Sequence, residues 1–140
     1  FRGEVFHSLM ESIVYDFQYE KVMDDFFSSG KINKNEFDSI NKLVKEIISS
    51  PEIKQFFNSQ NRVFNEREIY LDNKEVIRPD KILFHNKNEI SILDYKTGIK
   101  KQQDVKQVKN YISAMKKGGY KLKKAFLVYT RDELEIVQLA

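Results

Sequence analysis

The stretch "IRPDKILFHNKNEISILDYKTG", from Ile77 to Gly98, contains two strand-like runs separated by the turn residues "HNKN". Both runs are rich in β-branched and aromatic residues, which is typical of strands. Each run also carries an aspartate, Asp80 in the first and Asp94 in the second. A carboxylate in a buried strand is costly unless a partner offsets its charge. The stretch therefore predicts a β-hairpin whose two acids need a partner.

The length of the hairpin loop decides where these acids lie. If residues 86–88 form the loop, His85 pairs with Glu89, and counting back along the ladder puts Asp80 opposite Asp94 on the same face. A four-residue loop would shift the pairing by one residue.

A third charged residue follows the second acid, because alternation along the strand puts Lys96 on the same face as Asp94. Two opposed carboxylates repel each other. A hard divalent cation would resolve the conflict, and Mg²⁺ is the natural candidate because it prefers oxygen ligands and keeps several waters. The alternative is that one aspartate is solvated at a strand end and the other pairs with Lys96.

Around the hairpin, the spacing of apolar residues predicts the remaining elements. Helices are expected over residues 4–19, 34–48 and 102–117, with a short one at 53–57. Three antiparallel strands are expected in "VFNEREIYL", "EVIRPDKILF" and "EISILDYK", the first two joined by a "DNK" turn, and two more in "KKAFLVYT" and "LEIVQLA". The order predicts an α+β fold with a central mixed sheet of about five strands flanked by helices. We expect a single domain over 1–140, with a helical part at 1–60 and a sheet part at 61–140.

The composition excludes several classes of site. The chain has 140 residues and no cysteine, which excludes disulfides, thiolate zinc sites, iron–sulfur clusters and cysteine nucleophiles. No apolar run approaches 18 residues, so no membrane span is expected and a cytoplasmic location is the default. The sequence starts at Phe1 without an initiator methionine, and we expect it to be a domain excised from a larger protein.

The positive charge is concentrated in one segment. Residues 100–124 hold nine lysines and one acid, while the net charge of the whole chain is only +3. Such a run is either a solvated helix face or a track for a polyanion. In the second case the candidate phosphate contacts are Lys100, Lys101, Lys106 and Lys109.

Four other residues are candidates for the same site. Gln107 and Tyr111 lie one turn apart on the helix expected over 102–117, so both can face the acids; the alternative is an ordinary polar pair at a helix rim. His7 could supply an imidazole ligand, although a histidine beside an apolar stripe is commonly structural. Glu66, in the first expected strand, is a candidate to hydrogen-bond to the metal ligands or to bind a second metal. The alternative is an exposed strand glutamate without a role in the site.

These residues together resemble a known signature. Asp80, thirteen intervening residues and then Asp94-Tyr95-Lys96 resemble the PD-(D/E)XK nuclease motif, including its proline at Pro79. Within that superfamily, "GEVFH" at the start, "DYKTG" and "QVKNY" are similar to the C-terminal nuclease domain of RecB/AddA-type bacterial helicase-nucleases. The resemblance extends over nearly the whole chain. It departs where the family often has glycine and arginine, since this chain has Ile77 and Lys81 there.

The resemblance implies a restriction-endonuclease-like core and a Mg²⁺-dependent exonuclease, with Mn²⁺ as a substitute ion and no iron–sulfur cluster. It implies a larger UvrD/Rep-like helicase that uses ATP outside this chain, acts on DNA in break repair and recombination, and pairs with an AddB/RecC-like subunit. The implied metal ligands are His7, Asp80, Asp94 and the backbone carbonyl of Tyr95. The implied catalytic residues are Asp80, Asp94, Lys96, Gln107 and Tyr111. The alternative is an inactive nuclease-fold module that binds DNA or docks a partner.

Overall fold

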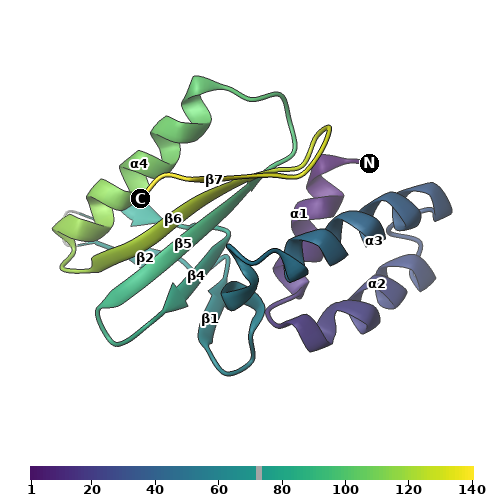
Figure 1. Ribbon diagram of the computed structural model, residues 1–140, viewed down its shortest axis with the longest axis horizontal. Coiled ribbons are helices and arrows are strands. Elements are labelled where there is room, and N and C mark those ends of the chain that lie inside the picture. Colours follow the sequence, from purple (N-terminus) through teal and green to yellow (C-terminus); the bar gives the residue numbers. More distant parts are fainter. Residues whose placement is uncertain (72–73) are drawn as a thin grey trace. The chain divides into compact units, whose positions relative to one another are not determined.

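The α+β architecture predicted from the sequence is confirmed in a computed structural model, which describes residues 1–71 and 74–140. Two units are distinguished along the chain, Phe1–Gln60 and Asn61–Ala140. Helices make up the first unit, and the second contains a five-stranded mixed sheet with a long helix, as Figure 1 shows. Each unit is described by itself below.

The helical unit departs from the predicted single helix over 4–19. Helix α1 ends at Ser12, and Ile13 has extended backbone geometry (φ −103°, ψ 95°). The side-chain oxygen of Gln18 accepts hydrogen bonds from the amides of Val14 and Tyr15 at 3.0 and 2.9 Å, which holds the chain in a turn. The helical elements of this unit are α1 (Gly3–Ser12), η1 (Asp16–Gln18), α2 (Tyr19–Ser28), α3 (Lys34–Ser49) and η2 (Lys54–Phe57).

Helix α3 confirms the prediction over 34–48, and its start is fixed by side chains. Asn33 accepts from the amide of Glu36 at 2.8 Å, and the Glu36 carboxylate accepts from the amide of Asn33 at 3.2 Å. This reciprocal pair satisfies two amides of the first turn. The guanidinium of Arg2 donates to the same carboxylate at 3.0 Å, and these contacts lower the pKa of Glu36 to about 2.

In the sheet unit the strand order is β1-β4-β5-β6-β7, and only β5 and β6 run parallel. Helix α4 connects these two parallel strands, which cannot be joined by a tight turn. Gly119, at φ +90°, follows the helix in a conformation that glycine adopts without strain. The elements are β1 (Arg62–Asn65), β4 (Lys81–Phe84), β5 (Glu89–Lys96), α4 (Gln102–Lys117), β6 (Lys121–Tyr129) and β7 (Glu135–Gln138).

The first two predicted strands are each interrupted. Glu66 takes a positive φ of 51°, which ends β1, and Pro79, which has no amide hydrogen, lies in the break before β4. The detached pieces, β2 (Ile69–Tyr70) and β3 (Val76–Ile77), pair with each other as a separate two-stranded sheet. The predicted "DNK" turn begins at residues 72–73, which lie outside the described residues.

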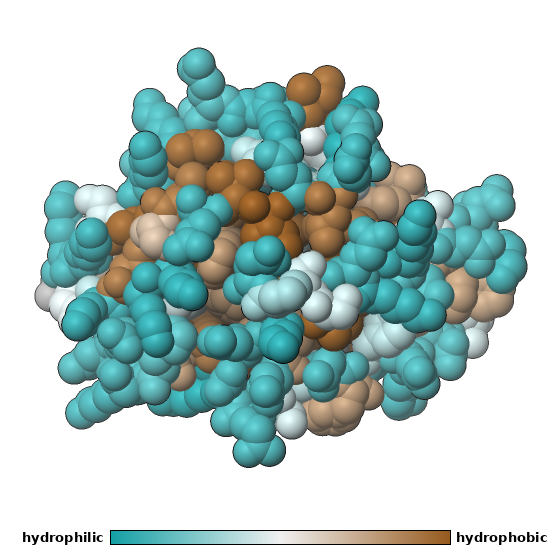
Figure 2. Space-filling view, in the orientation of Figure 1, coloured by the Kyte–Doolittle hydropathy of each residue, from teal (hydrophilic) through white to brown (hydrophobic). Residues whose placement is uncertain are grey.

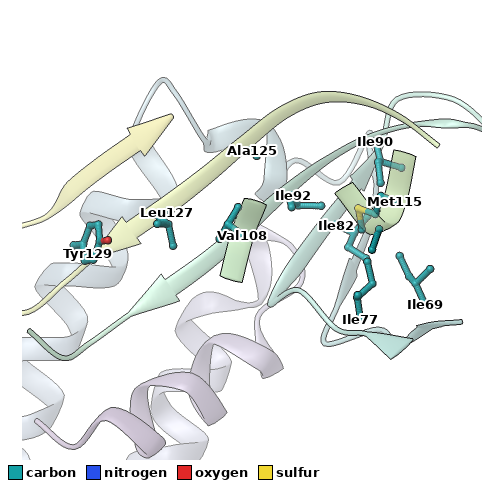
Figure 3. Close-up of a cluster of buried hydrophobic side chains, with 11 residues drawn as sticks. Ile69, Ile77, Ile82, Ile90, Ile92, Val108, Met115, Ala125, Leu127 and Tyr129 are labelled. Carbon is teal, nitrogen blue, oxygen red and sulfur yellow. The ribbon is translucent and has the colours of Figure 1, made fainter. Parts of the chain in front are cut away.

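A buried cluster joins α4 to one face of the sheet. Figure 3 shows Val108 and Met115 of α4 beside sheet residues that include Ile92 and Leu127. Both helix residues are at most 1% exposed. The small sheet contributes Ile69 and Ile77 to the same cluster. This packing fixes α4 over the sheet and therefore fixes the side chains at its first turns.

Figure 2 shows hydrophobic residues gathered on the visible face around the position that β6 and β7 occupy in Figure 1. Strand β7 pairs only with β6, and Ile136 and Val137 on it are half-buried. Elsewhere on this face hydrophilic residues dominate. Among residues 1–71 and 74–140, the helices lack the length and apolar character that crossing a membrane requires.

Candidate active site

The hairpin register is the one that places the two acids opposite each other. His85 donates its amide to the carbonyl of Glu89 at 2.8 Å, so residues 86–88 form the loop. The ladder then runs to Lys81 opposite Leu93. One further step sets Asp80 against Asp94, and the predicted register is confirmed.

Backbone amides hold both carboxylates. The amide of Asp80 donates to Oδ1 of Asp94 at 2.8 Å, and the amide of Tyr95 donates to Oδ2 of Asp80 at 2.8 Å. Asp94 is only 5% exposed, and Asp80 is half-buried just before β4. Asp80 thus lies just outside the strand and is partly exposed, but its carboxylate is held by an amide of the neighbouring strand. Each acid is oriented by the strand that carries the other.

A chain of polar contacts continues from these acids to α4. Lys96 Nζ lies 3.9 Å from Oδ2 of Asp94, which is beyond hydrogen-bond length. The same ammonium donates to Oε1 of Gln107 at 2.6 Å. The amide nitrogen of Gln107 in turn donates to the Tyr111 hydroxyl at 3.1 Å. The structure thus brings Asp80, Asp94, Lys96, Gln107 and Tyr111 together.

The alternation of side chains along a strand and the spacing of residues on a helix explain why these five residues lie together. On β5, Ile92 packs in the cluster beneath α4, and alternation puts Asp94 and Lys96 on that face, beyond the end of the cluster. On α4, Gln107 and Tyr111 are four residues apart and therefore lie on one side of the helix. The side chain of Tyr95 points to the opposite face, where it is buried, so only its backbone can serve the site.

Burial and the two carboxylate charges both act on the tyrosines near the site. Burial and the charges of Asp94 and Asp80 raise the pKa of Tyr111 to about 12. Burial followed by the same two charges raises the pKa of Tyr95 well above its ordinary value. Both phenols therefore stay protonated at neutral pH. A site with this field favours a cation.

The donor set fits Mg²⁺. Within the described ranges 1–71 and 74–140, no three acidic or histidine side chains are grouped closely enough to form a complete metal cage. Mg²⁺ does not need such a cage, because it binds through one or two carboxylates and keeps waters and substrate phosphate oxygens as its other ligands. Asp80 and Asp94, held side by side on amide hydrogen bonds, supply that pair of hard oxygen donors.

His7 belongs to the helical unit and lies on α1. Its Nδ1 is 3.0 Å from the carbonyl oxygen of Gly3. A carbonyl can only accept, so Nδ1 donates to it. A histidine whose Nδ1 donates in this way can ligate metal through Nε2. The assignment of His7 as a metal ligand stays a prediction.

The sequence predicted Glu66 within a strand, but the structure places it outside one. It follows β1 with a φ of 51°, and its amide donates to the carbonyl of Asp80 at 3.0 Å. Its carboxylate lies 3.3 Å from Nε of Arg78. The Glu66 charge also contributes to the raised pKa of Tyr111. Glu66 is therefore near the acids, with its carboxylate held by an arginine.

The four candidate lysines have different surroundings. Lys106 and Lys109 are exposed on α4, and Lys101 precedes the helix with its amide donating to Asp104 at 2.9 Å. Lys100 is paired with the carboxylate of Glu135. Its ammonium also lies 5.1 Å from the centre of the Tyr129 ring. Lys100 is thus already paired with a partner within the chain, although both side chains are exposed.

Sequence reasoning named no role for Lys81, which is 1% exposed. Alternation from Asp80 could have located it, because the next residue of the strand faces the other, buried side of the sheet. Its ammonium donates to Oδ1 of Asn65 at 2.7 Å, and burial lowers its pKa to about 7. Lys81 therefore lies on the opposite face of the sheet from Asp80 and Asp94.

Comparisons with known proteins give little beyond this geometry. No protein-family model matches the chain, and no curated protein matches it. Among solved structures it is similar to one described as "Crystal structure of SSO0001", with 16% identity and a TM-score of 0.38 over 96% of this chain. The chain spans 65% of that protein's length. The likeness is too low to carry an argument about fold or function.

Proposed function

We propose that this chain is a Mg²⁺-dependent nuclease domain of the PD-(D/E)XK type that hydrolyses DNA phosphodiester bonds as an exonuclease. The observation that supports this most directly is the contact chain from Asp80 and Asp94 through Lys96 to Gln107 and Tyr111. Two fixed acids beside a lysine suit a hydrolysis in which a cation, water and a phosphate must meet.

The acids would hold the ion together with the backbone carbonyl of Tyr95 and with His7. When bound, Mg²⁺ would supply positive charge to the phosphate and lower the pKa of water. Mn²⁺ offers similar oxygen-ligand chemistry and would substitute. Asp80 and Asp94 need little reorganisation for this task, because their carboxylates are already oriented by backbone amides.

Lys96 would act on the reacting phosphate and its water. Gln107 holds the ammonium at 2.6 Å, so its direction is set before substrate arrives. From there it would orient the attacking water or, through its positive charge, make that water easier for solvent to deprotonate, and it would stabilise charge on the pentacovalent phosphate. Tyr111 stays protonated, so its hydroxyl can donate to a phosphate oxygen while it accepts from Gln107.

Binding along the strand would be electrostatic. Lys100, Lys101, Lys106 and Lys109 would contact phosphates, which gives salt-dependent and sequence-independent affinity. In a whole protein, this domain would be the C-terminal part of a cytoplasmic, ATP-dependent RecB/AddA-type helicase-nuclease. Such an assembly would act in double-strand break repair and recombination with an AddB/RecC-like subunit.

The test is degradation of linear DNA by the purified chain in Mg²⁺, in Mn²⁺ and in EDTA, beside Asp80→Ala and Lys96→Ala. Lys117→Ala serves as control, because Lys117 is exposed at the far end of α4. Cleavage by the unmodified chain and the control, but not by the two site variants or in EDTA, would support the proposal. If the chain binds DNA and cuts under no divalent ion, the proposal of an enzyme fails, and the result favours the alternative of an inactive module that binds DNA.

A further inference from the structure

Arginine and aromatic side chains gather at the β1 edge of the sheet. The guanidinium carbon of Arg67 lies 4.2 Å from the centre of the Phe64 ring. That of Arg62 lies 5.3 Å from the Phe64 ring and 5.0 Å from the Phe84 ring. The two phenylalanine rings meet edge to face at 5.7 Å, and Phe84 meets Tyr120 at 6.4 Å. We call Arg62, Phe64, Arg67, Phe84 and Tyr120 the edge cluster.

The edge cluster lies on the same face of the sheet as the candidate active site. Phe64 pairs with Ile82, and Arg62 pairs with Phe84. Ile82 belongs to the buried cluster on the α4 side. Because directly paired residues share a face, Arg62 and Phe64 point to the side that carries Asp94.

Within the described residues of the sheet unit, α4 covers this edge less than it covers β6. Helix α4 packs mainly on β6, and β1 is the outermost strand at the other side of the sheet. Phe64, Phe84 and Tyr120 are accordingly only half-buried, and Arg62 and Arg67 are exposed. The outer faces of the guanidinium groups are therefore presented to solvent above aromatic rings.

We propose that the edge cluster is a stacking surface for the bases of an unpaired nucleic-acid strand. This inference rests on the proposed function, because the strand would lead to the nuclease site. Phe64 is opposite Ile82, which is two residues from Asp80, or ~7 Å along the strand. A strand that stacks on the edge cluster thus has its phosphates within a short distance of the acids.

The chemistry selects unpaired bases. In a duplex the faces of the bases are occupied by their neighbours, whereas unpaired bases can stack on aromatic rings and on guanidinium planes. Every base has such a face, so the surface would be indifferent to sequence. Arginine also brings a charge that attracts the phosphates. Lysine carries the same charge but has no planar group, so arginine-to-lysine substitutions separate stacking from charge attraction.

The experiment measures binding in EDTA, where no divalent ion is present to support cleavage. The ligands are a fluorescent twelve-residue oligothymidylate and an abasic oligomer of equal length, which has the same phosphates and no bases. The variants are Arg62→Lys/Arg67→Lys together, with Arg131→Lys, an exposed arginine of the β6–β7 turn, as control. Circular dichroism verifies that each variant is folded.

The unmodified chain and the control should bind oligothymidylate at least about tenfold more tightly than the abasic oligomer, given ~1–3 kcal/mol per stacked base. In the double lysine variant this preference should fall to about twofold or less, because the charge remains and the plane is lost. An undiminished preference in that variant, or no preference in the unmodified chain, overturns the inference. Either result leaves the nuclease proposal untouched, since that is judged by cleavage alone. A preference for oligothymidylate without any cleavage of DNA would support the stacking surface and contradict the nuclease proposal.

Discussion

The amide of Asp80 donates to the carboxylate of Asp94 across adjacent strands at 2.8 Å. The Asp80 carboxylate accepts in turn from the residue that follows Asp94. This reciprocity resolves part of the conflict between two opposed acids, because each charge is stabilised by an amide dipole. It does not neutralise them, and a cation remains the natural partner.

The first prediction concerns Gln107, which we regard as a positioning residue for Lys96. Gln107→Ala should lower kcat for DNA cleavage about 10- to 100-fold, as is typical when a group that orients a catalytic residue is lost. KM should change little, because the phosphate contacts on α4 remain. Steady-state kinetics on a labelled oligonucleotide measures the two constants separately.

Tyr111→Phe provides the graded comparison. It removes the hydroxyl that accepts from the Gln107 amide at 3.1 Å and that would donate to a phosphate oxygen, but it leaves the bond between Gln107 and Lys96 in place, so it should lower kcat less than Gln107→Ala does. A variant of Gln107 that raises KM alone would show that Gln107 binds substrate and does not position Lys96.

The second prediction concerns the support beneath the site. Ile92 is 1% exposed, between α4 and the sheet, so Ile92→Ala should reduce the free energy of unfolding by about 2–5 kcal/mol. Ile99 is 66% exposed, and Ile99→Ala should stay within about 0.5 kcal/mol of the unmodified chain. Urea denaturation followed by circular dichroism measures both. Equal effects at the two positions would contradict the packing described here.

The third prediction is a pH dependence from Glu36. Its contacts with Arg2 and Asn33 lower its pKa from 4.5 to about 2 in the folded chain. A lowered pKa means that the folded state binds fewer protons than the unfolded state between these values. Stability from Glu36 is therefore complete above pH 4.5 and is lost as the pH falls towards 2.

Glu36→Gln tests this dependence, because glutamine keeps the capping geometry with Asn33 and does not titrate. The difference in urea midpoint between the unmodified chain and this variant should shrink from pH 6 to pH 2.5. A difference that stays constant or grows over that range would show that Glu36 is not the titrating group.

The sequence predicted the helices correctly where apolar residues recur at a regular helical spacing. Helix α4 has the predicted bounds because its apolar stripe is regular and glycines follow it. The predicted helix over 4–19 was wrong beyond Ser12, because the side chain of Gln18 captures the amides of Val14 and Tyr15. Phe17, which that predicted helix included, is 69% exposed. Periodicity cannot detect such a local side-chain turn.

Part of the candidate site could also be predicted from the sequence. Register and alternation were sufficient to bring Asp80, Asp94 and Lys96 together, because the hairpin is local and its loop is short. The break at Glu66 was missed, since a positive φ at a glutamate has no sequence signal. The break at Pro79 was also missed, although a proline within a strand run signals an interruption. The pairing of Lys100 with Glu135 was missed because it joins residues far apart in the sequence.

The most direct test of the central claim is the rate at which Asp94→Asn degrades linear DNA in Mg²⁺. Asparagine keeps the oxygen that accepts the Asp80 amide, so the hairpin should remain intact while one charge is lost. The account predicts a loss of at least about 100-fold, with Asp132→Asn on the exposed β6–β7 turn unaffected. If Asp94→Asn cuts DNA within about fivefold of the unmodified chain's rate, Asp94 is not part of the catalytic site.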